Sequence, residues 1–235
     1  MELSFYAGAS GAQSSLKKLS VVSNNLANIN NDGFKPGQAE FRELVTQNLT
    51  GSENEKKDVH AGSGTRVVDT ATDFSVGALK ETGKEMDFAL PEKNAFFAVQ
   101  IPGSDAVHYT RTGRFHKGVM PDGLYLLTDE NAYVLDKDNQ PIRITEDENV
   151  AEKISVRAFD YLDHLVHEGG NRFSSPDDDH IVEKPQIIPG FLEGSGVNMA
   201  GEAVKMIEAQ RAYGAALKIV QVSDEIVGTV NSLRG

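Results

Sequence analysis

The residues best suited to metal chemistry lie in two short segments. "DHLVHEGG" contains Asp163, His164, His167 and Glu168, and "DDDH" ends with His180. Imidazoles and carboxylates at short spacing are ligands of zinc and related ions. These histidines fall in a region without a clear secondary-structure pattern, and their order is not the His-Glu-x-x-His of a metal-binding helix. We therefore expect a solvated loop there, with no metal and no other cofactor.

Other catalytic patterns are equally weak. "GSGT" at 62–65 lacks the lysine of a phosphate-binding loop, and no Gly-x-Ser-x-Gly marks a hydrolase nucleophile. Paired carboxylates could serve a glycosidase, but 35 acidic residues make chance pairs certain. Arg111 and Arg114 flank a tight turn, where cross-strand charge pairing is the simpler expectation. The sequence predicts that the protein is not an enzyme.

Composition narrows the class of protein further. A chain of 235 residues with 39% hydrophobic content has enough apolar surface for a core, and without cysteine it has neither disulfides nor thiolate metal sites. The net charge of −12 and the scattered basic residues argue against a nucleic-acid partner. The start has no basic segment followed by an apolar run, and no stretch reaches the roughly 18 apolar residues of a membrane span. We expect neither a cleaved signal peptide nor a membrane span.

Long amphipathic patterns occupy both ends of the chain. From Phe5 to Ile29 apolar residues recur at spacings of three and four, which predicts a helix, and Asn30–Gly33 supplies a stop signal. The same rhythm runs from about Met199 to about Leu233, a helix roughly 50 Å long. Gly201, Gly214 and Gly228 lie on this second helix, where they either allow close approach of another helix or are simply tolerated.

Between the helices the apolar period changes to two, which indicates an antiparallel β domain from about residue 63 to about residue 190. The expected strands are "TRVVDTATDFS", "FFAVQI", "VHYTRTGRFH", "LYLLTD", "AYVLD", "PIRIT" and "KISVRAFD". "TGSENEKKDVHAGSG" at 50–64 is typical of a flexible connector, and "SSPDDDH" at 174–180 of an exposed loop.

The predicted fold is α+β, with long N- and C-terminal helices that pair as a coiled-coil-like unit around an inserted, mostly antiparallel β domain. The expected divisions are 1–32 plus 196–235 for the helices, 33–62 for an extended connector and 63–195 for the β-rich domain. A pair of helices leaves part of each apolar stripe uncovered, so we expect self-assembly with other copies.

Two segments closely resemble the signatures of the bacterial flagellar rod and hook protein family. They are "SNNLANINNDGFK" at 23–35 and "GFLEGSGVNMAGEAVKMIEAQRAYGAALKIVQVSDEIVGTVNSL" at 190–233. "FFAVQ", "YTRTGRF", "PDGLYLLT", "AYVLD" and "GGNRF" resemble the β core of that family, so the likeness covers nearly the whole chain. The chain has Asn131 where the family usually has Gly.

The resemblance implies a structural axial subunit of the flagellar basal body. Such a subunit is exported unfolded by the flagellar type III apparatus, without a cleaved signal peptide, and assembles in the periplasm with itself and other rod proteins. Its terminal helices would form an inner tube that lines the export channel and transmits torque. The hook subunit has a further domain for which this chain has no room, so the resemblance favours the rod. The short connector favours the larger proximal rod subunit over the distal one, which stays the alternative.

The expected assembly interface lies on the two helices. Apolar and polar positions on their faces are expected to contact neighbouring helices, namely Leu16, Leu19, Leu26, Met206, Ile207, Gln210, Tyr213, Leu217 and Val220. Asn24, Asn25 and Asn28 are expected to bond backbone groups of packed helices, because amides both donate and accept. Phe34 would anchor the chain as it turns toward the β domain.

A second hypothesis is a secreted β module that binds a glycan. Its motivation is the aromatic and acidic loop chemistry expected around Tyr109, Tyr125 and Tyr161.

Overall fold

The computed structural model describes residues 2–43, 47–48, 60–61, 65–145, 150–176, 180–182 and 185–233. The chain divides into two compact units. The first, called here the helical unit, comprises Met1–Ala27, Gly37–Ala71 and Asn198–Gly235. The second, called the β unit, comprises Asn28–Pro36 and Thr72–Val197. The expected mixture of terminal helices and antiparallel strands is confirmed.

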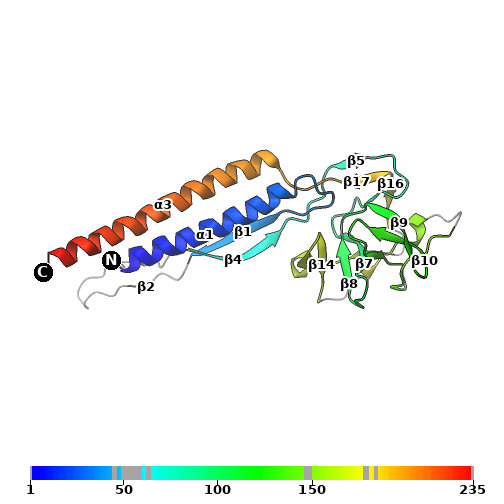
Figure 1. The fold of residues 1–235 in the computed structure, drawn as a ribbon, viewed down its shortest axis with the longest axis horizontal. Coiled ribbons are helices and arrows are strands. Elements are labelled where there is room, and N and C mark those ends of the chain that lie inside the picture. The colour runs from blue at the N-terminus through cyan, green and yellow to red at the C-terminus, as the bar shows by residue number, and fades with distance from the viewer. Residues whose placement is uncertain are drawn as a thin grey trace. The chain divides into compact units, whose positions relative to one another are not determined.

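Two long helices form most of the helical unit. α1 spans Glu2–Ala27 and α3 spans Met199–Ser232, and they lie side by side in opposite directions (Figure 1). α3 begins where the sequence predicts, because the side chain of Asn198 caps it by accepting a hydrogen bond from the Gly201 amide at 3.1 Å. α1 ends slightly earlier than expected, at Ala27, and a turn at 28–30 follows.

Strands accompany α1 in the helical unit. β1 (Gly37–Glu43) and β4 (Thr65–Thr72) form a two-stranded sheet beside α1 (Figure 1). β2 (Gln47–Asn48) and β3 (His60–Ala61) form a short antiparallel pair. β4 pairs with β1, and the residues of β4 up to Ala71 belong to the helical unit. Residues 44–46, 49–59 and 62–64, which include most of the flexible stretch expected at 50–64, lie outside the described residues.

A sheet that is antiparallel at every described pairing forms the centre of the β unit, in the order β13-β14-β8-β7-β11-β10-β9. β12 pairs with both β7 and β15. The bounds are β7 Ala95–Gln100, β8 Val107–Thr110, β9 Phe115–Met120, β10 Gly123–Thr128, β11 Tyr133–Val134, β12 Val156–Ala158, β13 Val166–Gly169, β14 Arg172–Ser174 and β15 His180–Ile181. Asn131, in the turn between β10 and β11, has a φ of +59°, a conformation that asparagine tolerates better than most residues.

Short elements complete the β unit. β5 (Leu79–Glu81) pairs with β17 (Phe191–Glu193), and β6 (Phe88–Ala89) pairs with β16 (Ile188–Pro189). The remaining elements are α2 (Val150–Lys153) and the 3₁₀ helix η1 (Leu162–His164).

Two sequence predictions within the β unit are wrong in detail. "PIRIT" makes isolated bridges through Pro141 and Arg143 instead of a strand, because Pro141 has no N–H to donate to a ladder. "DHLVHEGG" is not a loop without secondary structure, since it forms η1 and β13.

The core of the β unit has two parts, one on each face of β7. Phe96 and Phe97 are both fully buried, and as successive strand residues they point to opposite faces. Phe97 belongs to a cluster with Phe88, Phe115, Leu126, Val134 and Ile154, among others. Phe96 belongs to a second cluster with Phe74, Tyr109, Phe159, Leu165 and Phe173. The continuous apolar run "FFAV" is therefore buried on both of its sides.

Candidate assembly interface

Small residues bring α1 and α3 together. The hydroxyls of Ser4 and Ser223 lie 3.2 Å apart. A Cβ atom added at Gly8 would lie 3.0 Å from Val220 Cγ2 and 3.2 Å from the Ala216 carbonyl oxygen. Along α3 the buried residues recur every seven positions, at Glu202, Ala209, Ala216 and Ser223. This contact, called here the seam, consists mainly of small residues, together with the side chains of Ile219 and Val220, whose Cγ2 atoms lie beside Gly8.

The glycines that permit this approach are on α1, not on α3. An added Cβ at Gly214 or Gly228 would meet no atom within 4 Å, and one at Gly201 would meet only Asn198 of its own cap. The α3 glycines therefore do not serve the close approach of another helix of the same chain.

Asn25 closes one end of the seam. Its Nδ2 donates to the Gly37 carbonyl oxygen at 2.8 Å and to Glu202 Oε2 at 3.0 Å, and its Oδ1 accepts from the Gly37 amide at 3.0 Å. Lys205 Nζ donates to the other oxygen of Glu202 at 2.7 Å. Asn25 is 2% exposed and Glu202 is 4% exposed. One amide thus joins α1, β1 and α3. The backbone that Asn25 binds belongs to Gly37 of β1, and not to a packed helix as expected.

Asn25→Ala is expected to destabilise the helical unit by about 1–3 kcal/mol, because it leaves the Gly37 amide and carbonyl and one Glu202 oxygen without their partner. Urea unfolding followed by the helix signal in circular dichroism measures the change. Ser23→Ala, at an exposed position two residues earlier, is the matched control and should change stability little. Equal stability of the two variants would contradict the role assigned to Asn25.

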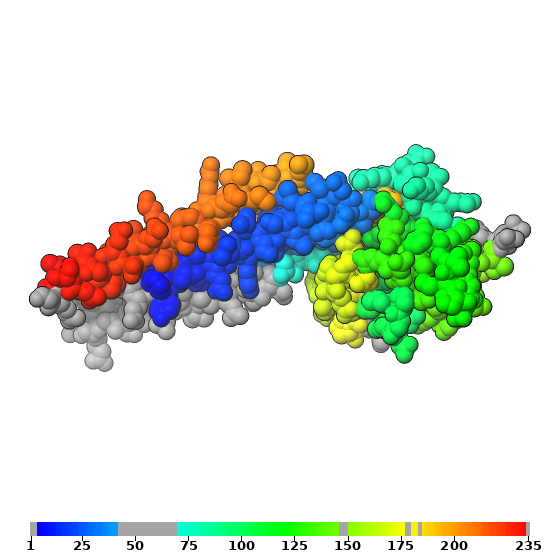
Figure 2. All heavy atoms as spheres, in the orientation of Figure 1, coloured from blue at the N-terminus to red at the C-terminus, as the bar shows by residue number. Residues whose placement is uncertain are grey.

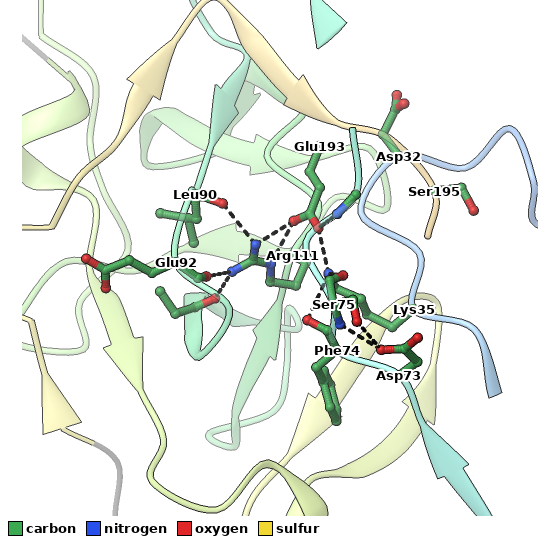
Figure 3. Close-up of polar contacts among 12 residues, drawn as sticks. Asp32, Lys35, Asp73, Phe74, Ser75, Leu90, Glu92, Arg111, Glu193 and Ser195 are labelled. Atoms are coloured by element: carbon green, nitrogen blue, oxygen red, sulfur yellow. Dashed lines mark hydrogen bonds and ion pairs between the residues drawn. The ribbon is translucent and has the colours of Figure 1, made fainter. Parts of the chain in front are cut away.

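Three charged side chains are buried together in the β unit. Glu193, on β17, lies between Lys35 and Arg111 (Figure 3). Lys35 Nζ is 2.5 Å from Glu193 Oε1, and Arg111 Nη2 is 2.7 Å from Glu193 Oε2. No side chain in this group, called here the ion cluster, is more than 1% exposed.

Every polar atom of the ion cluster has a partner. The five N–H groups of Arg111 reach Glu193 and the carbonyl oxygens of Leu90, Glu92 and Ala95. Lys35 donates to Glu193 and to the carbonyl oxygens of Phe74 and Ser75. The Gly77 amide donates to Glu193 Oε1 at 2.8 Å.

Burial affects the two cations of the ion cluster. Loss of hydration lowers the pKa of Lys35 and the pKa of Arg111, and the Glu193 carboxylate partly offsets this in both. With two cations and one anion, the cluster depends on Glu193 as its one counter-charge.

The ion cluster joins the two signature segments. The Gly33 amide donates to the Glu193 carbonyl oxygen at 2.7 Å, and the Gly196 amide donates to the Phe34 carbonyl oxygen at 3.0 Å. Gly33 has a φ of +70°, and an added Cβ there would lie 2.7 Å from the Arg111 carbonyl carbon. Phe34 itself is 5% exposed, as expected of an anchor.

Sequence reasoning missed the ion cluster. Arg111 was expected to pair across an exposed turn, but its side chain is fully buried. Lys35 and Glu193 were recognised only as residues of the two signature segments, and neither was assigned a role. The available signal was that Lys35 directly follows "GF" and Glu193 directly follows "FL". A charge beside such apolar residues can be buried, and a buried charge requires a partner elsewhere in the chain.

The expected interface residues divide into groups. Asn25 is buried, as described, and about half of the others are partly buried, namely Leu19, Leu26, Asn28, Met206, Tyr213 and Val220. The remaining ones are exposed, namely Leu16, Asn24, Ile207, Gln210 and Leu217. Leu16 is 47% and Ile207 is 51% exposed, so these large apolar side chains lie outside the seam.

The residues considered for metal or glycan binding do not form one site. His164 stacks on Tyr161, His167 packs edge-on against Phe173, and His180 contacts Asp160 at 3.2 Å. Burial also lowers the pKa of His167. Across the described ranges, no group of three metal-binding side chains is placed to hold an ion. Of the three tyrosines behind the glycan hypothesis, Tyr109 is buried in the core and Tyr125 packs against Tyr133.

One polar cavity of about 230 Å³ lies in the β unit, beside the turn that follows α1. The cationic side chains that line it are paired, Arg114 with Asp32 and Arg172 with Glu130.

Among the described helices, none combines the length and apolar character needed to cross a membrane.

Comparison with known proteins points to one family at both ends of the chain. A family model described as "Flagella basal body rod protein" matches residues 5–35. A second, described as "Flagellar basal body rod FlgEFG protein C-terminal", matches residues 188–233. The first match contains most of α1 together with Lys35, and the second contains β17 and α3.

Relatives match over nearly their whole length. The flagellar basal-body rod protein FlgG of Agrobacterium fabrum is 30% identical, with 95% of this chain and 96% of the relative covered. The rod protein FlgF of Caulobacter vibrioides is also 30% identical, with 96% and 95% covered. FlgG of Bacillus subtilis is 27% identical, with 98% of each chain covered.

Proposed function

The chain belongs to the flagellar basal-body rod protein family, and from this premise we propose that its terminal helices assemble copies into an axial array. Proteins of this family are structural and not enzymatic, so the chain is a structural subunit of the rod. Its place is the flagellar basal body, where it assembles with other rod components.

The observation that carries the assembly proposal is the composition of the seam. α1 and α3 contact each other mainly through glycine, alanine and serine, with Ile219 and Val220 beside Gly8, whereas Leu16, Ile207 and Leu217 remain exposed. Burying such residues removes apolar surface from water and stabilises association by about 25 cal/mol per Å². Because the seam does not use them, they are available to neighbouring subunits. The seven-residue spacing of the buried α3 residues supports a coiled-coil-like pairing of α1 with α3.

The distribution of charge supports the same arrangement. The β unit contains 24 acidic and 13 basic residues, and the rest of the chain contains 11 and 10. Helical units are therefore close to neutral and can pack together without strong mutual repulsion, whereas crowded β units would repel one another. We propose that the helical units form the inner tube around the export channel, with the β units outside.

Export and position complete the proposal. We propose that the flagellar export apparatus delivers the chain to the periplasm without cleavage of a signal peptide. Relatives named FlgG and FlgF match at the same 30% identity, so identity alone does not separate two positions in the rod. The larger proximal subunit remains our preferred assignment, and the distal subunit remains the alternative.

Deletion of the gene in the source bacterium, with imaging of the basal bodies, tests this function. We expect non-motile cells whose rods stop short, restored by the full chain but not by a chain without residues 1–30 and 200–235. The point at which rod growth stops separates the proximal from the distal assignment. Normal rods and motility with the shortened chain would contradict the proposal.

A further inference from the structure

The polar cavity of the β unit is lined by residues of three turns. Asn30 belongs to the turn after α1, Asp129 to the turn between β10 and β11, and Asn171 to the turn between β13 and β14. In Figure 2 the yellow segment that contains β14 lies against the green segments of the β unit, as its pairing with β8 requires. We call this space, of about 230 Å³, the turn cavity.

Threonines in the wall of the turn cavity hold the three turns in place. Thr112 Oγ1 donates to the Asp32 carbonyl oxygen at 3.1 Å, in the first turn. Thr128 Oγ1 accepts from the backbone amide at the end of the second turn, also at 3.1 Å. Thr110 Oγ1 donates to the Asn171 carbonyl oxygen at 2.9 Å, in the third turn. Because its walls are fixed in advance, the cavity can bind a ligand without first ordering these turns.

The charged side chains of the turn cavity largely neutralise one another. Arg172 pairs with Glu130, and Arg114 pairs with Asp32. Arg114 Nε also lies 3.8 Å from Asp129 Oδ2. An anionic ligand would therefore meet arginines that already have carboxylate partners, and a cationic ligand would meet Arg114 beside Asp129. This balance of charge favours an uncharged ligand.

Three polar side chains of the turn cavity are available to a ligand. Within the described residues the side-chain amides of Asn30 and Asn171 make no hydrogen bond, and Asp129 has only its distant contact with Arg114. Val99 is the one hydrocarbon side chain among the described lining residues, whereas most ligand sites are mainly apolar. An amide both donates and accepts, and so does a hydroxyl. The lining therefore suits a ligand rich in hydroxyl groups.

We propose that the turn cavity binds one sugar ring of a glycan through Asn30, Asn171 and Asp129. Neighbouring hydroxyls of the ring would accept hydrogen bonds from the two amides and donate one to the carboxylate. The volume of about 230 Å³ is far above the roughly 30 Å³ of one water and below the roughly 300–1,000 Å³ of sites for drug-sized ligands. It has room for a single ring, and the rest of the glycan would extend into solvent.

Calorimetric titration of the full-length protein tests this binding. The neutral probes are tri-N-acetylchitotriose and maltotriose, and trilysine is the cationic comparison. We expect saturable binding of at least one oligosaccharide and no binding of trilysine at the same concentrations. Binding of neither oligosaccharide, or of trilysine alone, would overturn the inference and leave the proposed rod function intact.

Variants locate the binding in the turn cavity. Asn171 has a φ of +55°, which glycine adopts without strain, so Asn171→Gly removes the amide and keeps the turn. We expect this change, and also Asp129→Ala, to weaken binding of the oligosaccharide by about two- to tenfold. Asn131→Gly is the matched control, because Asn131 has a φ of +59°, is exposed and does not line the cavity. Equal affinity of Asn171→Gly and Asn131→Gly for the oligosaccharide would overturn the inference.

Discussion

Replacing Glu193 with glutamine is expected to lower the free energy of unfolding of the β unit by about 3–5 kcal/mol. The carboxylate is 1% exposed and accepts bonds from Lys35, Arg111 and the Gly77 amide. A glutamine side chain at this position would leave two buried cations without a counter-charge, and its amide nitrogen would face donors. The loss is a large part of the roughly 5–15 kcal/mol that stabilises a typical domain.

Urea unfolding followed by near-ultraviolet circular dichroism of the buried aromatic cluster measures this change. Glu81→Gln is the matched control, because Glu81 lies on β5, directly opposite β17, and is exposed. Lys35→Met should cost less than Glu193→Gln, about 1–3 kcal/mol, since Arg111 and Glu193 would remain as a neutral pair. If Lys35→Met were the more damaging of the two, Glu193 would not be the centre of the cluster.

The Glu193→Gln substitution is also expected to affect assembly. The ion cluster joins Lys35, at the end of the first signature, to Glu193, at the start of the second. Glu193→Gln should therefore release the segment 28–36 from β17 and weaken assembly even though it changes neither helix. A stable β unit with normal assembly in this variant would contradict the structural role of the two signatures.

Replacing Gly8 with leucine is expected to prevent assembly of the rod. A Cβ atom at this position would already lie 3.0 Å from Val220 Cγ2 and 3.2 Å from the Ala216 carbonyl oxygen, so the helices must move apart to admit a larger side chain. Overpacking of this kind typically costs about 1–3 kcal/mol. Separation of α1 from α3 also misplaces the exposed faces that neighbouring subunits would contact.

Assembly of purified protein, followed by sedimentation and electron microscopy, measures the effect. Gln13→Leu is the control, because Gln13 is exposed on α1 and the change adds a leucine of the same size. We expect arrays from the control and none from Gly8→Leu at the same concentration. Arrays of normal form from Gly8→Leu would show that the close approach of α1 and α3 is dispensable.

Periodicity was sufficient to predict the elements but not their partners. The three-and-four rhythm located both helices because an apolar face is a local property of the sequence. It also favoured Leu16 and Leu217 as contacts with neighbouring helices, which stays a prediction. It did not locate the described contact between α1 and α3, which includes Ser4, Gly8 and Ala216. Hydrophobicity does not reveal which face of a helix needs small residues, because that depends on how closely the partner approaches.

The ion cluster was beyond sequence reasoning for a related reason. Lys35, Arg111 and Glu193 are separated by 76 and 82 positions, so no local pattern relates them. Asn131 shows the opposite case. The left-handed conformation of one turn residue is a local requirement, and asparagine meets it at a position where the family usually has glycine.

The central claim is that this chain is a rod subunit. Its helical units would form the inner layer of the rod, and its β units would form the outer layer. A density map of basal bodies isolated from the source bacterium tests this most directly, at a resolution that separates helices. We expect α1 and α3 of successive copies in the innermost layer around the channel, with the β units outside. A rod from which this chain is absent, or in which its β units line the channel, would contradict the account.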